Sequence, residues 1–213
     1  LWAVLLAYDA LSPEPEPQPD AAPDADTEAP APALTDRYRD PVRTADAARR
    51  RIHDAVQGSG RSLARVMSPI RAQADQVYAR LQSLVERAAR IDRFLAREIR
   101  EELEASLASL EEQAAATSDD FTREQYLQAR KAREEQLRDH DELALCLDRV
   151  HAQIANVVSS LEAAEAKVIK LQAADLRHAG DVTDAVTRSL QELSHEMTGF
   201  QESVDATIAL RAR

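Results

Sequence analysis

Three pairs of side chains in this sequence have a spacing that could bind a metal ion on a helix. Each pair places a carboxylate three residues before a histidine, so that both lie on one helical face, as in bundles that hold two iron ions. The pairs are Asp148 with His151, Asp175 with His178, and Glu192 with His195. The helix register derived below does not bring the pairs together, so we expect exposed polar side chains and no metal site.

Nucleophilic catalysis has equally little support. Cys146 is the single cysteine, and its neighbour His140 lies on a different helical face, so we expect a partly buried thiol with no base to activate it. One cysteine also excludes a disulfide within the chain and a metal site made of several cysteines. Gly58-Ser59-Gly60 is too short for a phosphate-binding loop and follows a helix. We therefore predict no catalytic residue, no cofactor and no small-molecule substrate, and hence a protein that is not an enzyme.

A run of three arginines, Arg49-Arg50-Arg51, is the remaining chemical feature. It lies in residues 37–66, which hold eight Arg against three Asp. Two interpretations are open: contact with anionic lipid, or a solvated helix face whose guanidinium groups pair with carboxylates of neighbouring helices. We favour the second, because an acidic segment separates the run from the candidate membrane anchor.

The acidity of the chain is concentrated at its start. The formal net charge is −11, and residues 1–36 contain eight acids and no Lys or Arg. An acidic segment of this kind disfavours binding to nucleic acid. Aromatic residues make up 4% of the chain, whereas strong helix formers such as Ala, Leu, Glu and Arg dominate it. This composition predicts an all-α fold.

The first 36 residues divide into two segments. Leu1–Tyr8 is apolar throughout but too short to cross a bilayer, which needs about 20 residues. We weigh two interpretations of it: the end of a transmembrane helix, or a short helix that docks on the body. Residues 12–35 hold seven of the nine prolines, which predicts a disordered, extended linker. The expected division is therefore an apolar segment at 1–11, a linker at 12–36 and a helical domain at 37–213.

Start and stop signals predict four helices in that domain. Asp40-Pro41 begins the first, which ends at Gly58-Ser59-Gly60. Ser68-Pro69 begins the second, which continues to about Ala116. A capping box of Thr122 and Gln125 begins the third.

The residues that flank the capping box support the same helix start. Phe121 and Tyr126 have the spacing of a hydrophobic staple around the capping box. The third helix then runs to about His178 and ends at Gly180. Asp181 begins a fourth helix of about 30 residues.

The second and third helices carry apolar residues at heptad spacing. These stripes are Ile70, Ala74, Val77, Leu81, Leu84, Ala88, Ile91 and Leu95, and then Leu143, Leu147, Val150, Ile154, Val157, Leu161, Ala164, Val168 and Leu171. If the two helices fold as an antiparallel hairpin, facing residues have numbers that add to about 239, and the two regular stripes then coincide. We expect an elongated antiparallel hairpin, a coiled coil, on this basis.

The far end of the hairpin differs from its base. Residues 97–116 are mainly acidic and residues 123–142 are rich in Arg and Lys, which predicts a charged, weakly cored and mobile end. The first and fourth helices carry their own apolar stripes and lie at the base. We therefore expect them to flank the hairpin and form a three- or four-helix stem.

These features favour a non-catalytic structural or protein-interaction protein, tethered to a membrane through its N-terminus and binding a protein partner or a second copy through its helical faces. The expected architecture resembles that of the membrane-remodelling ESCRT-III and phage-shock-protein superfamily, although no sequence motif of that group is present. That resemblance implies an alternative function, a hairpin that remodels membranes. A helical bundle that transmits a signal is the other alternative.

Overall fold

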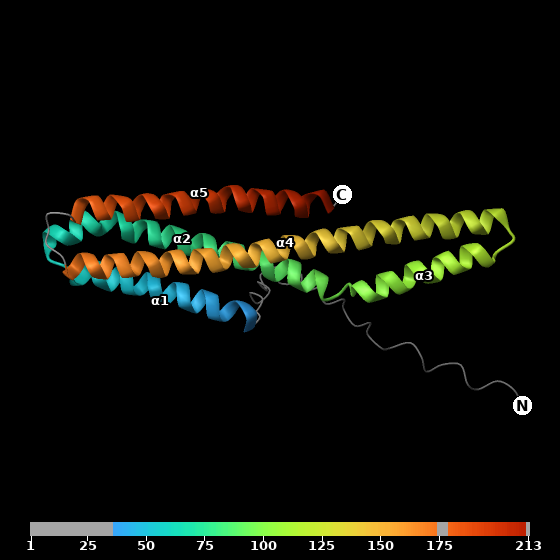
Figure 1. The fold of residues 1–213 in the computed structure, drawn as a ribbon, viewed down its shortest axis with the longest axis horizontal. Coiled ribbons are helices and arrows are strands. Elements are labelled where there is room, and N and C mark those ends of the chain that lie inside the picture. The colour runs from blue at the N-terminus through green and yellow to red at the C-terminus, as the bar shows by residue number, and fades with distance from the viewer. Residues whose placement is uncertain (1–35, 174–178, 212–213) are drawn as a thin grey trace, which may run out of the picture. The chain divides into compact units, whose positions relative to one another are not determined.

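A computed structural model describes residues 36–173 and 179–211, and every element in them is an α-helix (Figure 1). The helices are α1 (Asp36–Gly58), α2 (Arg61–Leu95), α3 (Arg100–Ala116), α4 (Asp120–Ala173) and α5 (Ala179–Arg211). The predicted all-α fold is confirmed for these residues, which contain no strand. The segment expected at 1–11 and residues 12–35 of the linker expected at 12–36 lie outside the described residues, whereas Asp36 is the first residue of α1.

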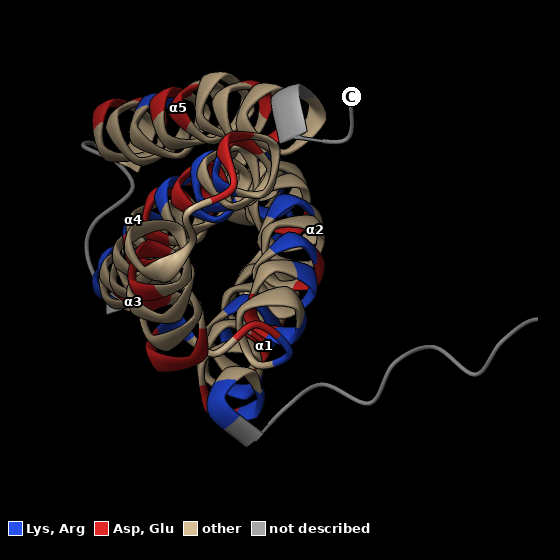
Figure 2. Cartoon of the chain, turned by 90° about the vertical axis from the view of Figure 1, so that its right-hand side faces the viewer, with Lys and Arg blue, Asp and Glu red and all other residues tan. Residues whose placement is uncertain are grey.

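Helices α2 and α4 form the central pair, and both α1 and α5 pack against the two of them. Figures 1 and 2 show α1 and α5 on opposite faces of this pair. Helix α3 packs on the first part of α4, beyond the region that α1 and α5 cover. We call α1, α2, α5 and residues 143–173 of α4 the stem, and α3 with residues 120–142 of α4 the arm.

The core of the stem consists of the apolar stripes predicted from the sequence. Every member of the two heptad stripes is buried except Leu95, which is partly buried and packs against the core. Helix α1 adds small side chains at Ala45, Ala48 and Ala55, which let it approach the central pair closely. Helix α5 adds Val186, Leu190, Leu193, Met197 and Val204. The core also takes in Tyr38, Met67 and Val85, which were not predicted.

The pairing of α3 with α4 is visible in two ion pairs across the arm. Arg100 Nε lies 3.1 Å from Asp141 Oδ1, and Arg130 Nη1 lies 3.8 Å from Glu111 Oε1. As one residue number rises the other falls, so the two helices are antiparallel. Both pairs lie within two residues of the register expected from the heptad stripes.

The helix predicted from Ser68 to Ala116 is helical on both sides of an interruption at residues 96–99, where it bends. Helix α2 ends at Leu95, and Ile99, the residue before α3, has an extended backbone with φ −82° and ψ 123°. The apolar residues in this region recur every four positions, a spacing that turns the stripe away from its partner helix. The break between α2 and α3 turns the apolar stripe back toward α4. Ile99, in the break, is 47% exposed, whereas Leu103, in α3, is buried against α4.

Two predicted helix starts are wrong. Helix α1 begins at Asp36, so Pro41 lies within it, and α2 begins at Arg61, so Pro69 lies within it. Each proline removes one backbone hydrogen bond. Residues before each proline nevertheless enter the core, Tyr38 in α1 and Met67 in α2, and their burial favours the longer helices.

The start of α4 uses a different cap from the predicted one. The backbone N–H of Thr122 donates to Asp119 Oδ2 at 2.7 Å, so Asp119 caps the helix and Thr122 lies inside it. Hydrogen bonding from Thr122, first through its side chain and then through its backbone N–H, holds the pKa of Asp119 below its usual value. Phe121 is 73% exposed, so the expected staple with Tyr126 does not form.

Gly180 does not end a helix, because α5 begins at Ala179 and contains both Gly180 and Asp181 in its first turn. Helix α4 is described as far as Ala173. The predicted end of the third helix at His178 lies outside the described residues. Among residues 36–173 and 179–211, no helix combines the length and apolarity that crossing a membrane requires.

Candidate functional site

Tyr38 lies where three helices meet. It is in the first turn of α1, its side chain is 1% exposed, and it contacts residues of α2 and α4. It lies beside Asp92, one turn before the end of α2, and so is close to the break that separates stem from arm. A buried phenol requires a hydrogen-bond partner, and Tyr38 has two.

The partners of Tyr38 form a closed polar cluster. Tyr38 Oη lies 3.3 Å from Asp92 Oδ2 and 3.0 Å from His151 Nε2. Arg37 Nη2 lies 3.1 Å from His151 Nδ1, and Arg37 Nη1 lies 3.8 Å from Asp92 Oδ1. We call Arg37, Tyr38, Asp92 and His151 the Tyr38 cluster. It joins α1, α2 and α4 through side chains alone.

The donors and acceptors of the Tyr38 cluster are compatible with one protonation state. A guanidinium group only donates hydrogen bonds, so His151 Nδ1 must carry a lone pair. The proton of the neutral imidazole is therefore on Nε2, which donates to Tyr38 Oη. Tyr38 in turn donates to the Asp92 carboxylate. Each donor in the cluster thus faces an acceptor, and moving any one proton would leave a hydrogen bond without its donor.

The electrostatics of the cluster reinforce this state. Burial, and then the charge of Asp92, raise the pKa of Tyr38 to about 12, so the phenol stays neutral. Burial, and then the charge of Arg37, lower the pKa of His151 below its ordinary value. The imidazole is therefore neutral at pH 7. The hydrogen bonds of Tyr38 and His151 thereby connect α1 to both α2 and α4.

Acidification should loosen the stem through His151. The unfolded chain binds a proton near pH 6.5 and the folded chain only at lower pH, so stability is lost as pH falls below about 6.5. The charged groups around the imidazole are Arg37, which opposes protonation, and Asp92 and Asp148, which favour it. We expect the urea midpoint to fall between pH 7 and pH 5, and to fall less in His151→Gln. Equal pH dependence in the two proteins would contradict this assignment.

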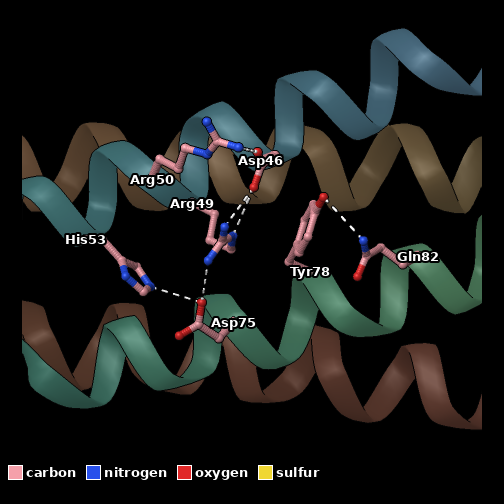
Figure 3. Close-up of polar contacts among 7 residues, drawn as sticks. All are labelled: Asp46, Arg49, Arg50, His53, Asp75, Tyr78 and Gln82. Atoms are coloured by element: carbon pink, nitrogen blue, oxygen red, sulfur yellow. Dashed lines mark hydrogen bonds and ion pairs between the residues drawn. The ribbon is translucent and has the colours of Figure 1, made fainter.

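A second polar network joins α1 to α2 (Figure 3). Arg49 reaches Asp46 on its own helix at 2.8 Å and Asp75 on α2 at 2.9 Å, and its guanidinium lies over the Tyr78 ring at 5.0 Å. His53 Nε2 shares Asp75, also at 2.9 Å. These hydrogen bonds raise the pKa of Arg49 and lower that of Asp46.

The other two arginines of the basic run are also paired. Arg50 contacts Asp46 at 2.5 Å, and Arg51 donates to both oxygens of Glu165 on α4 at 3.0 Å. All three guanidinium groups therefore contact carboxylates of the stem, as the second interpretation of the run expects. Arg50 and Arg51 also border a shallow, open hollow on α1, whose other lining residues are Arg43, Asp46 and Ala47.

The sequence-derived candidates for metal binding stay apart. His151 belongs to the Tyr38 cluster while Asp148 is exposed, and Glu192 and His195 are exposed on α5. Asp175 and His178 lie outside the described residues. Within the described ranges, no group of three or more His, Cys, Asp or Glu side chains is placed to hold a metal ion.

The thiol candidate, Cys146, is buried. Cys146 is 7% exposed and lies in the hydrophobic core of the stem. Burial raises its pKa above the ordinary value, which favours the protonated thiol at pH 7. His140, the neighbouring base considered from the sequence, contacts Asp141 at 3.7 Å.

The Tyr38 cluster itself was missed at the sequence level. The predicted first helix began at Asp40, which left Arg37 and Tyr38 outside the bundle. One signal was present: Tyr38 lies seven residues before Ala45, at the same heptad position of the apolar stripe. A buried aromatic residue there would have placed the helix start earlier.

Comparison with known proteins adds no further information about the site. The chain matches no protein-family model, no curated protein and no solved structure. The functional argument therefore depends on the contacts and exposed surfaces of the described helices.

Proposed function

We propose that this chain is a non-catalytic interaction protein in which the stem is a scaffold and the arm is a contact element. The supporting observation is that the arm continues past the ends of α1 and α5 as a helix pair with little core of its own (Figure 1). In this proposal α2, α3 and α4 form the expected antiparallel hairpin, and α1 and α5 brace its base.

The stem has the properties of a scaffold. Its central residues are fully buried over several heptads, and its polar groups connect neighbouring helices. Arg87, for example, donates to both carboxylate oxygens of Asp205 on α5, at 2.7 and 2.9 Å. Two parallel hydrogen bonds of this kind fix the relative position of two helices.

The arm presents residues that its own fold does not bury. In α3 only Leu103 and Ala114 are buried, and at the tip Phe121 is 73% exposed and Leu127 is 42% exposed. A single exposed apolar residue is common on protein surfaces, but a phenylalanine at the end of a projecting helix pair is well placed to enter a partner.

The membrane part of the proposal rests on the sequence of Leu1–Tyr8, which lies outside the described residues. If that segment completes a transmembrane helix, the linker at 12–36 would hold the stem at a distance from the bilayer. Protein expressed from its complete gene should then fractionate with membranes, and protease cutting in residues 12–35 should release the helical domain. A full-length protein that stays out of the membrane fraction would contradict the tether.

The contact role of the arm can be tested with a photo-crosslinking amino acid. We expect p-benzoylphenylalanine at Phe121 to give one discrete adduct in the cells that produce the protein. The matched control is the same amino acid at Ile169, which is 48% exposed on the stem part of α4. The substitution Glu112→Arg, on the exposed side of α3, should reduce the adduct at Phe121 if the arm is recognised as a unit.

Two outcomes would contradict the contact role. One is the absence of an adduct at Phe121, and the other is an equal yield at Ile169. Filaments on liposomes that form independently of Phe121 would favour membrane remodelling, and a ligand-dependent change in the packing of the stem would favour a signalling bundle.

A further inference from the structure

Helix α5 presents an acidic outer face. The helix holds six carboxylates against two arginines; all six are exposed, and five of them lie on the outer face. These five are Asp181, Asp184, Glu192, Glu196 and Glu202. The sixth, Asp205, is paired with Arg87. Within the part of the chain that the structure describes, these five form no ion pair. The exposed Arg188 lies on the same face between Asp184 and Glu192, so the face keeps a net negative charge.

Helix α2 presents a basic outer face. The helix holds seven arginines against three acids, and its exposed arginines on the side away from the core are Arg61, Arg65, Arg90 and Arg93. Arg61 and Arg65 contact no carboxylate in the described residues, and Arg93 donates only to the backbone oxygen of Ala89 at 3.1 Å. Glu86 is the one acid of this face.

The contacts that α2 makes with α5 and α1 are on two other sides of the helix, and they leave its outer face uncovered. Arg80 and Arg87 mark the side that packs on α5, through contacts to Ser194 and Asp205. Asp75 and Asp92 mark the side that packs on α1. The residues at heptad spacing after Arg65, which are Ala72, Ala79, Glu86 and Arg93, lie between these two sides and are exposed. Figure 2 shows blue turns along α2 and red turns along α5 in the stem.

Both faces also carry small side chains between their charged residues. Between its charged ends the face of α2 has Ala72, Ala79 and Ser83, and the face of α5 has Ala185 and Gly199 among its acids. A Cβ added at Gly199 would meet no atom within 4 Å, so this part of α5 is open. Small side chains allow two helices to approach closely while charged groups pair on either side.

We propose that the acidic face of α5 in one copy binds the basic face of α2 in a second copy. The two faces are different surfaces of one chain, so each copy retains one unfilled face and association continues head to tail. The inference rests on the proposed interaction function and names a second copy as the partner of the stem.

A second copy fits the basic face better than an anionic lipid surface does. The acids of α5 lie on the helix next to α2, so a vesicle that approached the arginines would also meet a face of net negative charge. A second copy instead offers those carboxylates to the arginines. Opposite charges at this interface would set orientation and association rate.

The test is sedimentation velocity of the full chain with two charge-reversed proteins. The α2 variant carries Arg61→Glu, Arg65→Glu and Arg93→Glu. The α5 variant carries Glu192→Lys, Glu196→Lys and Glu202→Lys. We expect the unmodified chain to form species that grow with concentration at about 50 mM salt and to be monomeric at about 1 M, where screening is complete within a few ångströms. Each variant alone should associate at least about tenfold more weakly, a loss of about 1.4 kcal/mol.

Mixing the two variants should restore association, because each then offers the charge that the other lacks. A control with Lys131→Glu, Lys167→Glu and Lys170→Glu, all exposed on α4, changes the charge by the same amount outside both faces and should associate normally. Circular dichroism checks that every protein keeps its helicity.

Three results would overturn the inference: a chain that is monomeric at every concentration, variants that associate normally, or a mixture that stays monomeric. Binding of a monomeric chain to vesicles of phosphatidylglycerol, lost in the α2 variant, would assign the basic face to lipid instead. Crosslinking at Phe121 is read separately, so failure here leaves the proposed role of the arm to its own test.

Discussion

Replacing Tyr38 with alanine is expected to lower the free energy of unfolding by about 3–5 kcal/mol, which is among the largest effects of a single substitution in this chain. The ring is 1% exposed and fills the space where α1 meets α2 and α4. Its removal would leave a cavity and would also leave Asp92 and His151 without the hydroxyl that connects them. Urea denaturation followed by circular dichroism at pH 7 measures the change.

Tyr38→Phe separates the two contributions. It keeps the ring and removes the hydroxyl, so we expect a loss of about 1–3 kcal/mol, the cost of leaving buried polar groups unpaired. The pH dependence assigned to His151 should also change, because Nε2 then has no acceptor in the cluster. A Tyr38→Ala protein within about 1 kcal/mol of the unmodified chain would show that α1 contributes little to the fold at this end.

Replacing Leu161 with alanine is expected to cost about 2–5 kcal/mol, whereas the same substitution at Leu127 should cost less than about 1 kcal/mol. Both residues are leucines of α4, so helix propensity changes equally in the two variants. Leu161 is 0% exposed in the stem, and Leu127 is 42% exposed in the arm. The comparison therefore measures how much of the core lies in each part.

Hydrogen exchange provides the matching measurement on the unmodified chain. Backbone amides around Leu161 should exchange only on global unfolding, and those around Leu127 should exchange by local opening of the arm. A large cost at Leu127, or equal protection at the two positions, would mean that the arm is as firmly packed as the stem. Either result would remove the reason for treating it as a contact element.

Much of the bundle follows from heptad spacing alone. The stripe from Leu143 to Leu171 is buried as predicted, because an apolar residue repeated every 3.5 positions has one low-energy arrangement, against other helices. The same reasoning placed Cys146 beside the core and left His195 on the surface, as the structure does. The burial of Cys146 and the exposure of His195 were therefore predictable from their positions in the heptad.

Helix ends were predicted less well, for a reason of magnitude. A cap or a proline signal contributes about 1–3 kcal/mol, and the burial of one large side chain contributes a comparable amount. Pro69 lies inside α2 because Met67 and neighbouring residues gain more from packing than the missing hydrogen bond costs. Signals of similar size cannot be ranked from the sequence without knowing which side chains become buried.

The sequence by itself determined which residues face the core of the stem, since that depends on spacing along one helix. Only the tertiary structure decided where α2 breaks, because Leu103 must turn to meet α4. It alone assembled the Tyr38 cluster as well, whose members come from three helices and are separated by up to 114 residues. Polar contacts of this kind depend on the distance between helices and on hydrogen-bond direction, and the amino-acid sequence specifies neither directly.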